Sequence, residues 1–290
     1  MYFCNDNITY LIMKIIADSS ASRTEWTLLD DATVVEHAFT KGLNPFFQTR
    51  RDISHIIRLE LPEAFFKKRW EHIYFYGAGC SNAEKKKIVE ASLVAQFKTP
   101  VSVESDLLGA ARGLFITEPG IACILGSGSN SCFYDGKTVV KNVRSLGFVL
   151  GDEGSASYIG KHFVSDCLKD IAPEHLRNSF YEYIHLSPDQ IMDSIFDSEL
   201  PGNTLSVYSR FLMDKLDMDY VYDLIYSSID AFFNRNIRQY DYKNNVISFV
   251  GSNACAYSGV LNEVAKSYGI TIKKILPSSI PGLVKYHSIK

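Results

Sequence analysis

The 290-residue sequence predicts an α/β protein with mixed sheets and a cleft between two related domains. Three observations lead to this fold class. The order strand, strand, strand, helix, strand, helix occurs twice along the chain. Small or acidic residues directly follow apolar strands at four places. Finally, 46% of the residues are hydrophobic, which is enough for a substantial core.

The first copy of this order begins at Met13. Alternating apolar residues and β-branched residues predict its strands, and apolar residues at helical spacing predict its helices. The predicted elements are strands Lys14–Asp18, Glu25–Asp30 and Thr33–Phe39, helix Thr49–Leu59, strand His72–Tyr76, a helix through Val89, Leu93 and Phe97, strand Pro100–Val103 and helix Leu107–Leu114. Ser81 and Glu84 have the spacing of a capping box for the helix that follows them.

The second copy follows the turn Thr117–Gly120. Its predicted elements are strands Ile121–Leu125, Cys132–Tyr134 and Thr138–Val143, helix Ser155–Leu168, a helix-rich stretch to about Tyr240, strand Val246–Val250, helix Val260–Tyr268 and strand Ile270–Ile275. Residues 1–12 are aperiodic, and Met13 directly precedes a strand. We therefore expect residues 1–12 to be an extension outside the fold.

Charge and composition exclude several classes of protein. The net charge of -3 and the pI near 6.2 give no basic stripe, so nucleic acid is not an expected partner. No apolar run approaches the roughly 20 residues that cross a bilayer, and the start of the chain does not resemble a signal peptide. The six cysteines are scattered without a C-x-x-C pair. This pattern favours reduced thiols and a cytoplasmic location over a disulfide framework or a zinc site.

The four strand ends are the candidate ligand-binding segments. They are Asp18–Thr24, Glu104–Asp106, Gly126–Ser131 and Gly251–Ala254. Each alone could be an ordinary turn. Ligands of α/β proteins bind at strand ends, however, so four such segments in two repeated halves indicate a nucleotide cleft.

Two aspartates in these segments suit phosphoryl transfer. Asp18 could hold Mg²⁺ through water, since this ion favours one or two carboxylates and retains its hydration. Asp106 could orient a substrate hydroxyl and accept its proton. The alternative for Asp106 is an N-cap of the helix that follows, and the two roles are compatible.

The segment Gly151-Asp152-Glu153-Gly154-Ser155 is the most informative in the chain. Two acidic residues before a helix could simply complement the helix dipole. The glycines on both sides, however, permit close approach of a ligand, and carboxylates are good acceptors for sugar hydroxyls.

Taken together, these motifs resemble the N-acetylglucosamine kinases of the BadF/BadG/BcrA/BcrD-type ATPases, within the sugar kinase, heat-shock 70 and actin superfamily. The resemblance covers Met13 to nearly the C-terminus. It rests on Asp18 with Thr24-Glu25-Trp26, Gly42-Leu43-Asn44-Pro45, Tyr76-Gly77-Ala78-Gly79-Cys80, Asp106, Leu125–Asn130, Gly151–Ser155, Gly251-Ser252 and Pro281–His287. The most specific part is the pairing of Leu125–Asn130 with Gly151–Ser155.

The resemblance implies two ribonuclease-H-like domains, as in actin-like ATPases, that close over ATP and Mg²⁺. They would span residues 13–116 and 117–278, with a C-terminal helix at 279–290 returning to the first domain. The implied ATP phosphate-binding residues are Ser19, Ser20, Ser22, Arg23, Thr24, Gly126, Ser127, Gly128 and Ser129. Gly251 and Ser252 would lie on the adenosine side. Asn44, Asn130 and Asp152 would bind the sugar, with Asp106 as the catalytic base.

The first phosphate loop departs from the family, whose members usually have glycine there. If a missing glycine served a positive-φ position, Ser20 would cost roughly 1 kcal/mol. Arg23 stands in place of the commoner lysine, which keeps the charge but alters its geometry.

Three functions follow as hypotheses. The first is ATP-dependent phosphorylation of the 6-hydroxyl of an amino sugar, with N-acetylglucosamine as the expected substrate. The second is an activator ATPase of the 2-hydroxyacyl-CoA dehydratase or benzoyl-CoA reductase type, whose iron–sulfur cluster would need ligands such as Cys123 and Cys132. The third is a non-catalytic sugar or nucleotide sensor, motivated by Ser20 and Ala21 in the first loop, where the family usually has glycine. The expected partner is a small-molecule sugar, and a homodimer stays open.

Overall fold

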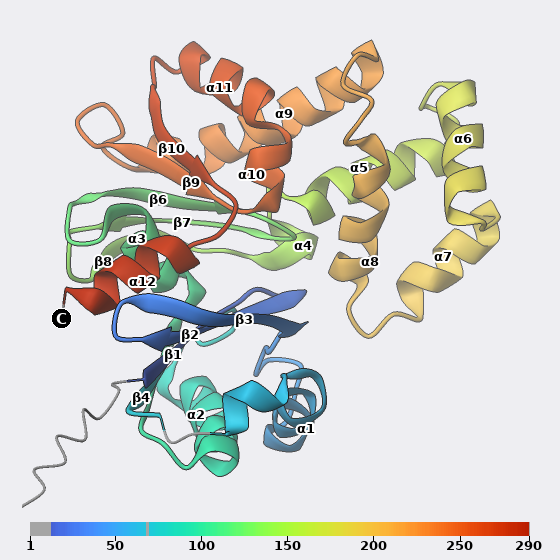
Figure 1. The fold of residues 1–290 in the computed structure, drawn as a ribbon. Helices are drawn as coiled ribbons and strands as arrows, with labels where there is room; N and C mark the ends of the chain where they lie inside the picture. Colours follow the sequence, from blue (N-terminus) through green and yellow to red (C-terminus); the bar gives the residue numbers. More distant parts are fainter. Residues whose placement is uncertain (1–12, 68–69, 290) are drawn as a thin grey trace, which may run out of the picture.

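The computed structural model describes residues 13–67 and 70–289, so the expected extension at residues 1–12 lies outside the described residues. The described chain forms two five-stranded mixed sheets with the strand orders β3-β2-β1-β4-β5 and β10-β9-β6-β7-β8. Read from its other edge, the second order repeats the first. The predicted α/β class and the internal duplication are therefore confirmed. Figure 1 shows the N-terminal sheet (blue) below the C-terminal sheet (green and orange).

The N-terminal sheet has an antiparallel half and a parallel half. Strands β1, β2 and β3 are antiparallel neighbours, and β4 and β5 run parallel to β1. The elements are β1 (Met13–Ser19), β2 (Arg23–Asp30), β3 (Thr33–Lys41), α1 (Arg50–Glu60), a 3-10 turn (Glu63–Phe66), β4 (His72–Gly77), α2 (Ala83–Phe97), β5 (Val101–Ser105) and α3 (Asp106–Phe115).

The start of α2 differs from the sequence prediction. The N-cap is Asn82, whose side-chain oxygen accepts a hydrogen bond from the Lys85 N–H at 2.9 Å. The capping box expected at Ser81 and Glu84 is therefore wrong. Asparagine is as good an N-cap as serine, and its position one residue later fixes where the helix begins.

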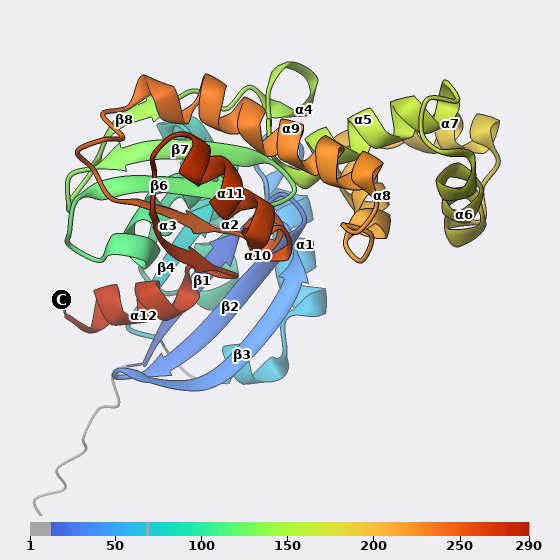
Figure 2. The ribbon, with the colours of Figure 1, turned by 90° about the horizontal axis from the view of Figure 1, so that it is seen from above.

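The C-terminal sheet repeats this plan with a long helical insertion. Its elements are β6 (Gly120–Leu125), β7 (Ser129–Tyr134), β8 (Val139–Val143), β9 (Ile247–Val250), α10 (Ser252–Ala256), α11 (Ser258–Ser267), β10 (Ile272–Leu276) and α12 (Ile280–Ser288). The helices between β8 and β9 are α4 (Gly147–Leu150), α5 (Ala156–Leu168), α6 (Glu174–Ile184), α7 (Pro188–Phe196), α8 (Pro201–Tyr208) and α9 (Asp219–Arg235). Figures 1 and 2 place α6 and α7 at the end of this insertion farthest from the sheets.

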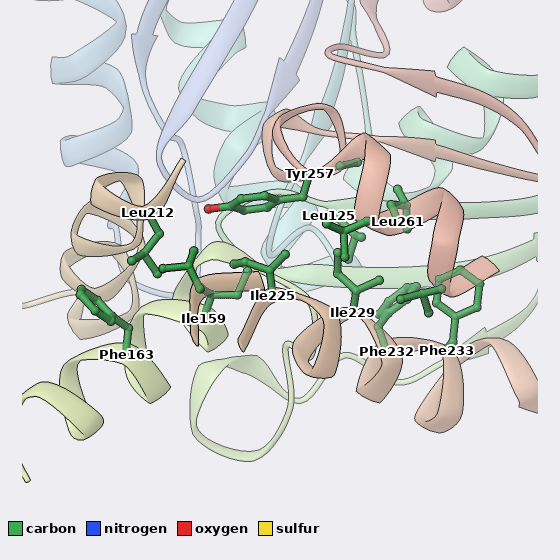
Figure 3. Packing of buried hydrophobic residues seen from close by; sticks show 14 of the residues in the cluster. Leu125, Ile159, Phe163, Leu212, Ile225, Ile229, Phe232, Phe233, Tyr257 and Leu261 are labelled. Atoms are coloured by element: carbon green, nitrogen blue, oxygen red, sulfur yellow. The ribbon is translucent and has the colours of Figure 1, made fainter. Parts of the chain in front are cut away.

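The largest hydrophobic core lies between the C-terminal sheet and the helices α5, α9 and α11. Leu125, at the end of β6, is fully buried in it together with Phe232 of α9 and Leu261 of α11. Figure 3 shows these side chains pointing toward one another. Because β6 ends in this core, the loop that follows Leu125 starts from a fixed position.

Helices α3 and α12 each pack against the sheet of the other half of the chain. Helix α3 follows the N-terminal sheet but packs its small residues against Ala122, Cys132 and Val250 of the C-terminal sheet. Helix α12 follows the C-terminal sheet and packs Ile280 and Leu283 against the N-terminal sheet. In Figure 1 the two helices lie between the sheets. The expected boundaries, 13–116, 117–278 and a returning helix at 279–290, remain a proposal.

Candidate active site

The carboxyl ends of β1, β4 and β5 lie side by side at one edge of the N-terminal sheet. Ser19 pairs with Gly77, and Gly77 pairs with Ser105. Asp18 is the residue before Ser19, and Asp106 directly follows β5. The structure thus brings the two predicted acidic residues to the same edge, where ligands of such sheets bind.

The first loop is a tight turn between β1 and β2. The Ser20 N–H donates to the Arg23 carbonyl at 2.9 Å, and the Ser20 hydroxyl donates to the same carbonyl at 3.0 Å and accepts from the Arg23 N–H at 3.2 Å. No residue from 20 to 24 has a positive φ. The backbone strain considered for Ser20 therefore does not arise. Ser20, Ser22 and Arg23 are exposed, and the Arg23 guanidinium lies 4.4 Å from the centre of the Phe39 ring.

Ser19 and Thr24 occupy the inner side of this turn. Both are fully buried, and their hydroxyls lie 2.7 Å apart. The Ser19 hydroxyl accepts from the Leu43 N–H at 2.9 Å, and the Thr24 hydroxyl donates to the Lys41 carbonyl at 3.0 Å. These two hydroxyls have hydrogen-bond partners within the fold, and the direct phosphate contacts expected of them remain a proposal. The exposed side chains of the loop keep that expected role.

Asp18 is a half-buried carboxylate with a weakened acidity. Burial raises its pKa to about 7, and the nearby charges of Asp106 and Glu25 raise it further, while a hydrogen bond donated by the Ser279 hydroxyl lowers it. With this pKa, the Asp18 carboxyl is only partly ionised at neutral pH. A cation placed here would favour its ionised form.

Asp106 is the first residue of α3 and lies at the junction of the two sheets. The N-cap is Ser105, whose hydroxyl accepts from the Leu108 N–H at 3.2 Å, so the alternative of Asp106 as the N-cap is wrong. The Asp106 carboxylate accepts from the Leu107 N–H at 2.8 Å. Burial raises its pKa to about 6 against the lowering effect of such backbone bonds. This value is close to neutral pH, which suits a general base.

The second loop connects β6 to β7 and is fixed by the start of α5. The Ala156 N–H donates to the Gly126 carbonyl at 2.9 Å, and the Ser157 N–H donates to the Ser127 carbonyl at 3.1 Å. A Cβ added to Gly126 would meet no atom within 4 Å, so there is open space beside the loop. The loop combines a rigid backbone with room for a ligand.

Gly251 places the end of β9 against this loop. Its φ is +129°, and a Cβ there would overlap the Leu125 carbonyl oxygen. Ser252 begins α10 and is exposed. The two residues predicted for the adenosine side therefore lie next to the second predicted phosphate loop.

Asp152 also lies against the second loop. It has a φ of +61°, and its Oδ1 accepts from the Ser129 N–H at 3.2 Å and from the Ser145 hydroxyl at 3.4 Å. Burial raises its pKa. On the neighbouring strand, the Asn130 Oδ1 accepts from the Asn142 side-chain amide at 2.9 Å. Two of the three predicted sugar-binding residues thus come from adjoining parts of the C-terminal half.

A pocket of about 350 Å³ opens beside Asp152. Ser129, Glu153 and Arg235 line it, and the Arg235 Nε lies 2.5 Å from Glu153 Oε1. Neither Asp18 nor Asp106 lines this pocket. It therefore borders the C-terminal part of the predicted site, with Asp152 from the expected sugar side and Ser129 from the second phosphate loop.

Asn44 lies in the N-terminal half, in the loop after β3, and is close to Gly79, which follows β4. A Cβ added to Gly79 would overlap the Asn44 side-chain oxygen, which accepts from the Phe46 N–H at 2.9 Å. Among the described residues, the structure gives no hydrogen bond between Asn44 and Asn130 or Asp152. These predicted sugar ligands therefore come from opposite halves of the chain without direct contact.

Sequence reasoning missed Ser278 and Ser279, which precede α12. The Ser279 hydroxyl donates to Asp18, and the Ser278 hydroxyl donates to Glu25 at 2.8 Å. Pro277 separates both serines from β10, which ends at Leu276. A search for small residues directly after a strand did not find them, because Leu276 and Pro277 follow the predicted strand end at Ile275.

Comparison with solved structures shows which family the chain belongs to. A protein from Porphyromonas gingivalis, whose proposed activity is that of an N-acetylglucosamine kinase, is 36% identical, and the match covers 95% of this chain and 99% of that one with a TM-score of 0.91. The chain belongs to the N-acetylglucosamine kinase family. A second protein with this proposed activity, from Chromobacterium violaceum, has a TM-score of 0.74 at 14% identity, over 95% of this chain and 99% of that one.

The fold itself is that of the actin-like ATPases. A ROK family glucokinase from Streptomyces griseus, solved with glucose and AMPPNP, matches over 96% of this chain and 98% of its own length, with a TM-score of 0.59 and 12% identity. No protein-family model matches the sequence, and a search of curated proteins finds no relative. In the part of the chain that the structure describes, no helix is long and apolar enough to span a bilayer.

The cysteines beside the second loop do not form a surface suited to a metal cluster. Cys123 and Cys132 are both fully buried and belong to two different hydrophobic clusters. Burial raises the pKa of both thiols, which disfavours the thiolates that bind iron. This arrangement gives no support to the activator ATPase hypothesis.

The acidic residues fit the expected Mg²⁺ ion in one specific way. No group of three or more His, Cys, Asp or Glu side chains in residues 13–67 and 70–289 is arranged to hold a metal ion. A nucleotide-bound Mg²⁺ needs no such group, because it takes one or two carboxylates, with phosphate oxygens and water as its other ligands. Asp18 can supply such a carboxylate, and the space beside Gly126 leaves the backbone of the second loop accessible.

Proposed function

We propose that the protein transfers the γ-phosphoryl group of ATP to the 6-hydroxyl of an amino sugar, N-acetylglucosamine. The observation that carries this proposal is the position of Asp106, at the start of the helix that joins the two sheets, with a pKa of about 6 and within electrostatic reach of Asp18. Membership of the N-acetylglucosamine kinase family supports N-acetylglucosamine as the substrate.

Asp106 acts as the catalytic base in this proposal. Its carboxylate accepts the proton of the sugar 6-hydroxyl as that oxygen bonds to the γ-phosphorus and the bond to ADP breaks. The Leu107 N–H, bonded to Asp106 Oδ1, holds the carboxylate in place. When bound near Asp18, Mg²⁺ neutralises part of the phosphate charge.

The two loops hold the phosphates. On the first loop, the exposed Ser20, Ser22 and Arg23 supply hydroxyl and guanidinium donors. The buried hydroxyls of Ser19 and Thr24, which bond each other, stabilise the turn. The second loop, Gly126 to Ser129, supplies its backbone and serine side chains. Gly251 and Ser252 take the adenosine side.

The sugar lies between Asn44 of the N-terminal half and Asn130 and Asp152 of the C-terminal half. Asp152 has one oxygen bonded to the Ser129 N–H and the Ser145 hydroxyl, and in this proposal its other oxygen accepts from a sugar hydroxyl. A cytoplasmic location and a homodimer are further parts of this proposal.

The sensor hypothesis loses its main motivation. It depended on a first loop impaired by Ser20 and Ala21. The turn has no positive φ at these positions, and the Ser20 hydroxyl closes the turn through bonds to Arg23.

A coupled assay of ADP release tests the proposal across N-acetylglucosamine, glucosamine, N-acetylmannosamine and glucose. We expect the highest kcat/KM with N-acetylglucosamine. Failure to turn over any of the four sugars, by protein that circular dichroism shows to be folded, would contradict the proposed function.

A further inference from the structure

The loop between β10 and α12 contacts the acidic side of the site from the far end of the chain. The Ser279 hydroxyl donates to Asp18 Oδ2, and Ser279 is almost fully buried. Its neighbour Ser278 donates to Glu25 Oε2 at 2.8 Å. Asp18 and Glu25 are directly paired on β1 and β2, so two adjacent serines bond two adjacent carboxylates.

Ser279 also contacts the helix that carries Asp106. A Cβ added to Gly113 of α3 would lie 2.7 Å from the Ser279 Cβ, and a Cβ added to Gly282 of α12 would overlap the Gly113 carbonyl. The two helices therefore cross with their backbones in contact at this point. A shift of α12 at the crossing would have to move α3 as well.

These contacts connect Asp106 to Asp18 by a second route, through α3 and Ser279. Asp106 begins α3, and Gly113 lies two turns further along, about 10 Å at the helical rise. Gly113 contacts Ser279, Ser279 bonds Asp18, and the pairing of β1 with β4 and of β4 with β5 places Asp18 and Asp106 at the same sheet edge. The separation of the two aspartates is thus defined through the C-terminal segment as well as through the N-terminal sheet.

We infer that Ser279, supported by Ser278, is a positioning residue that holds Asp18 in register with Asp106. This inference rests on the proposed function. Ser279 touches neither substrate in this scheme. It fixes the direction of the Asp18 carboxylate and couples that direction to the crossing of α3 and α12.

The first test replaces the hydroxyl alone. S279A keeps the Cβ that packs at Gly113, so we expect a folded protein whose kcat falls about tenfold or more, as expected for loss of a hydrogen bond to a charged group. The KM for sugar should not change, because Asn44, Asn130 and Asp152 are untouched. The Mg²⁺ concentration that gives half-maximal rate should rise. The matched control is S288A on the same helix, whose hydroxyl bonds only the Val284 carbonyl, and it should behave as wild type.

The second test does not depend on turnover. The increase in Tm on adding Mg²⁺ and ADP is measured for wild type, S279A, D18N and the double variant. If Ser279 acts through Asp18, S279A lowers this increase in the wild-type background and has no further effect in the D18N background. Additive effects of the two substitutions, or an S279A protein with unchanged kcat and Mg²⁺ dependence, would overturn the inference. If wild type transfers phosphate to no sugar, the proposed function fails, whereas the Tm cycle still decides the role of Ser279.

Discussion

Asp106 combines a position at the junction of the two sheets with an unusually basic carboxylate. Its pKa of about 6 arises from burial, and the bond from the Leu107 N–H only partly offsets this effect. Burial is also the main cause that raises the pKa of Asp18, to about 7. Two partly buried carboxylates near each other are costly to keep charged, and such perturbed pKa values cluster at functional sites.

Replacing Asp106 with asparagine removes the base and keeps the shape of the side chain. We expect kcat to fall by about 10²–10⁴. The affinities for ATP and N-acetylglucosamine, measured by calorimetry, should change little. An Asp106→Asn variant with near wild-type kcat would remove Asp106 from the role of base.

The rate should also depend on pH through Asp106. The base must be ionised to accept a proton, so kcat/KM should fall as the pH drops through about 6, and protonation of Asp18, whose pKa is about 7, should begin the fall at a higher pH. The measurement is a pH–rate profile with circular dichroism at each pH to verify folding. A flat profile down to pH 5 in folded protein would contradict this assignment.

The same carboxyl should affect stability with a defined sign. Its folded pKa of about 6 lies above the ordinary value of 3.8, so its contribution to stability is present below about pH 4 and is lost as the pH rises through 6. Asp106→Asn should therefore raise the free energy of unfolding at pH 8 by about 1–3 kcal/mol and by much less at pH 4. Urea unfolding at the two pH values measures this difference, and equal effects at both would count against a buried, shifted carboxyl.

At the scale of elements, the two phosphate loops are held by different means. The first is closed by the Ser20 hydroxyl and supported by buried Ser19 and Thr24. The second is held by the N–H groups of α5 and by the close approach of Gly251. Gly251 and Gly126 therefore differ in whether a side chain fits at their positions.

Gly251→Ala should destabilise the protein, because the new Cβ would overlap the Leu125 carbonyl at a φ of +129°. We expect a loss of about 2 kcal/mol or more in the free energy of unfolding. The matched variant Gly126→Ala has open space for its Cβ, so it should fold normally and raise the KM for ATP. Equal stability of the two variants in urea unfolding would contradict this account of the loop.

Much of the element order could be predicted because each strand carries its own pattern. The three strands of each half alternate in apolar content, and α1, α5 and their neighbours show helical spacing. Helices α4 and α10, of four and five residues, could not be predicted, since one turn is too short to show a period. The positive φ of Asp152 is set by its contacts with the second loop and has no local signal.

At the scale of the whole molecule, the last helix of each half packs against the sheet of the other half. Helix α3 packs on the C-terminal sheet and α12 on the N-terminal sheet, so the two halves share the surfaces that carry the site. The sequence indicated the duplication and the positions of Asp18 and Asp106. The bond from Ser279 to Asp18 joins residues 261 positions apart, and no local pattern reports such a contact.

The measurement that tests the central claim most directly is identification of the product formed from ATP and N-acetylglucosamine. Phosphorus and proton NMR of the reaction mixture would locate the transferred phosphate. We predict N-acetylglucosamine 6-phosphate and ADP in equal amounts with wild type, and neither above background with Asp106→Asn. A phosphate on another hydroxyl, or ADP formed without a sugar phosphate, would contradict the account.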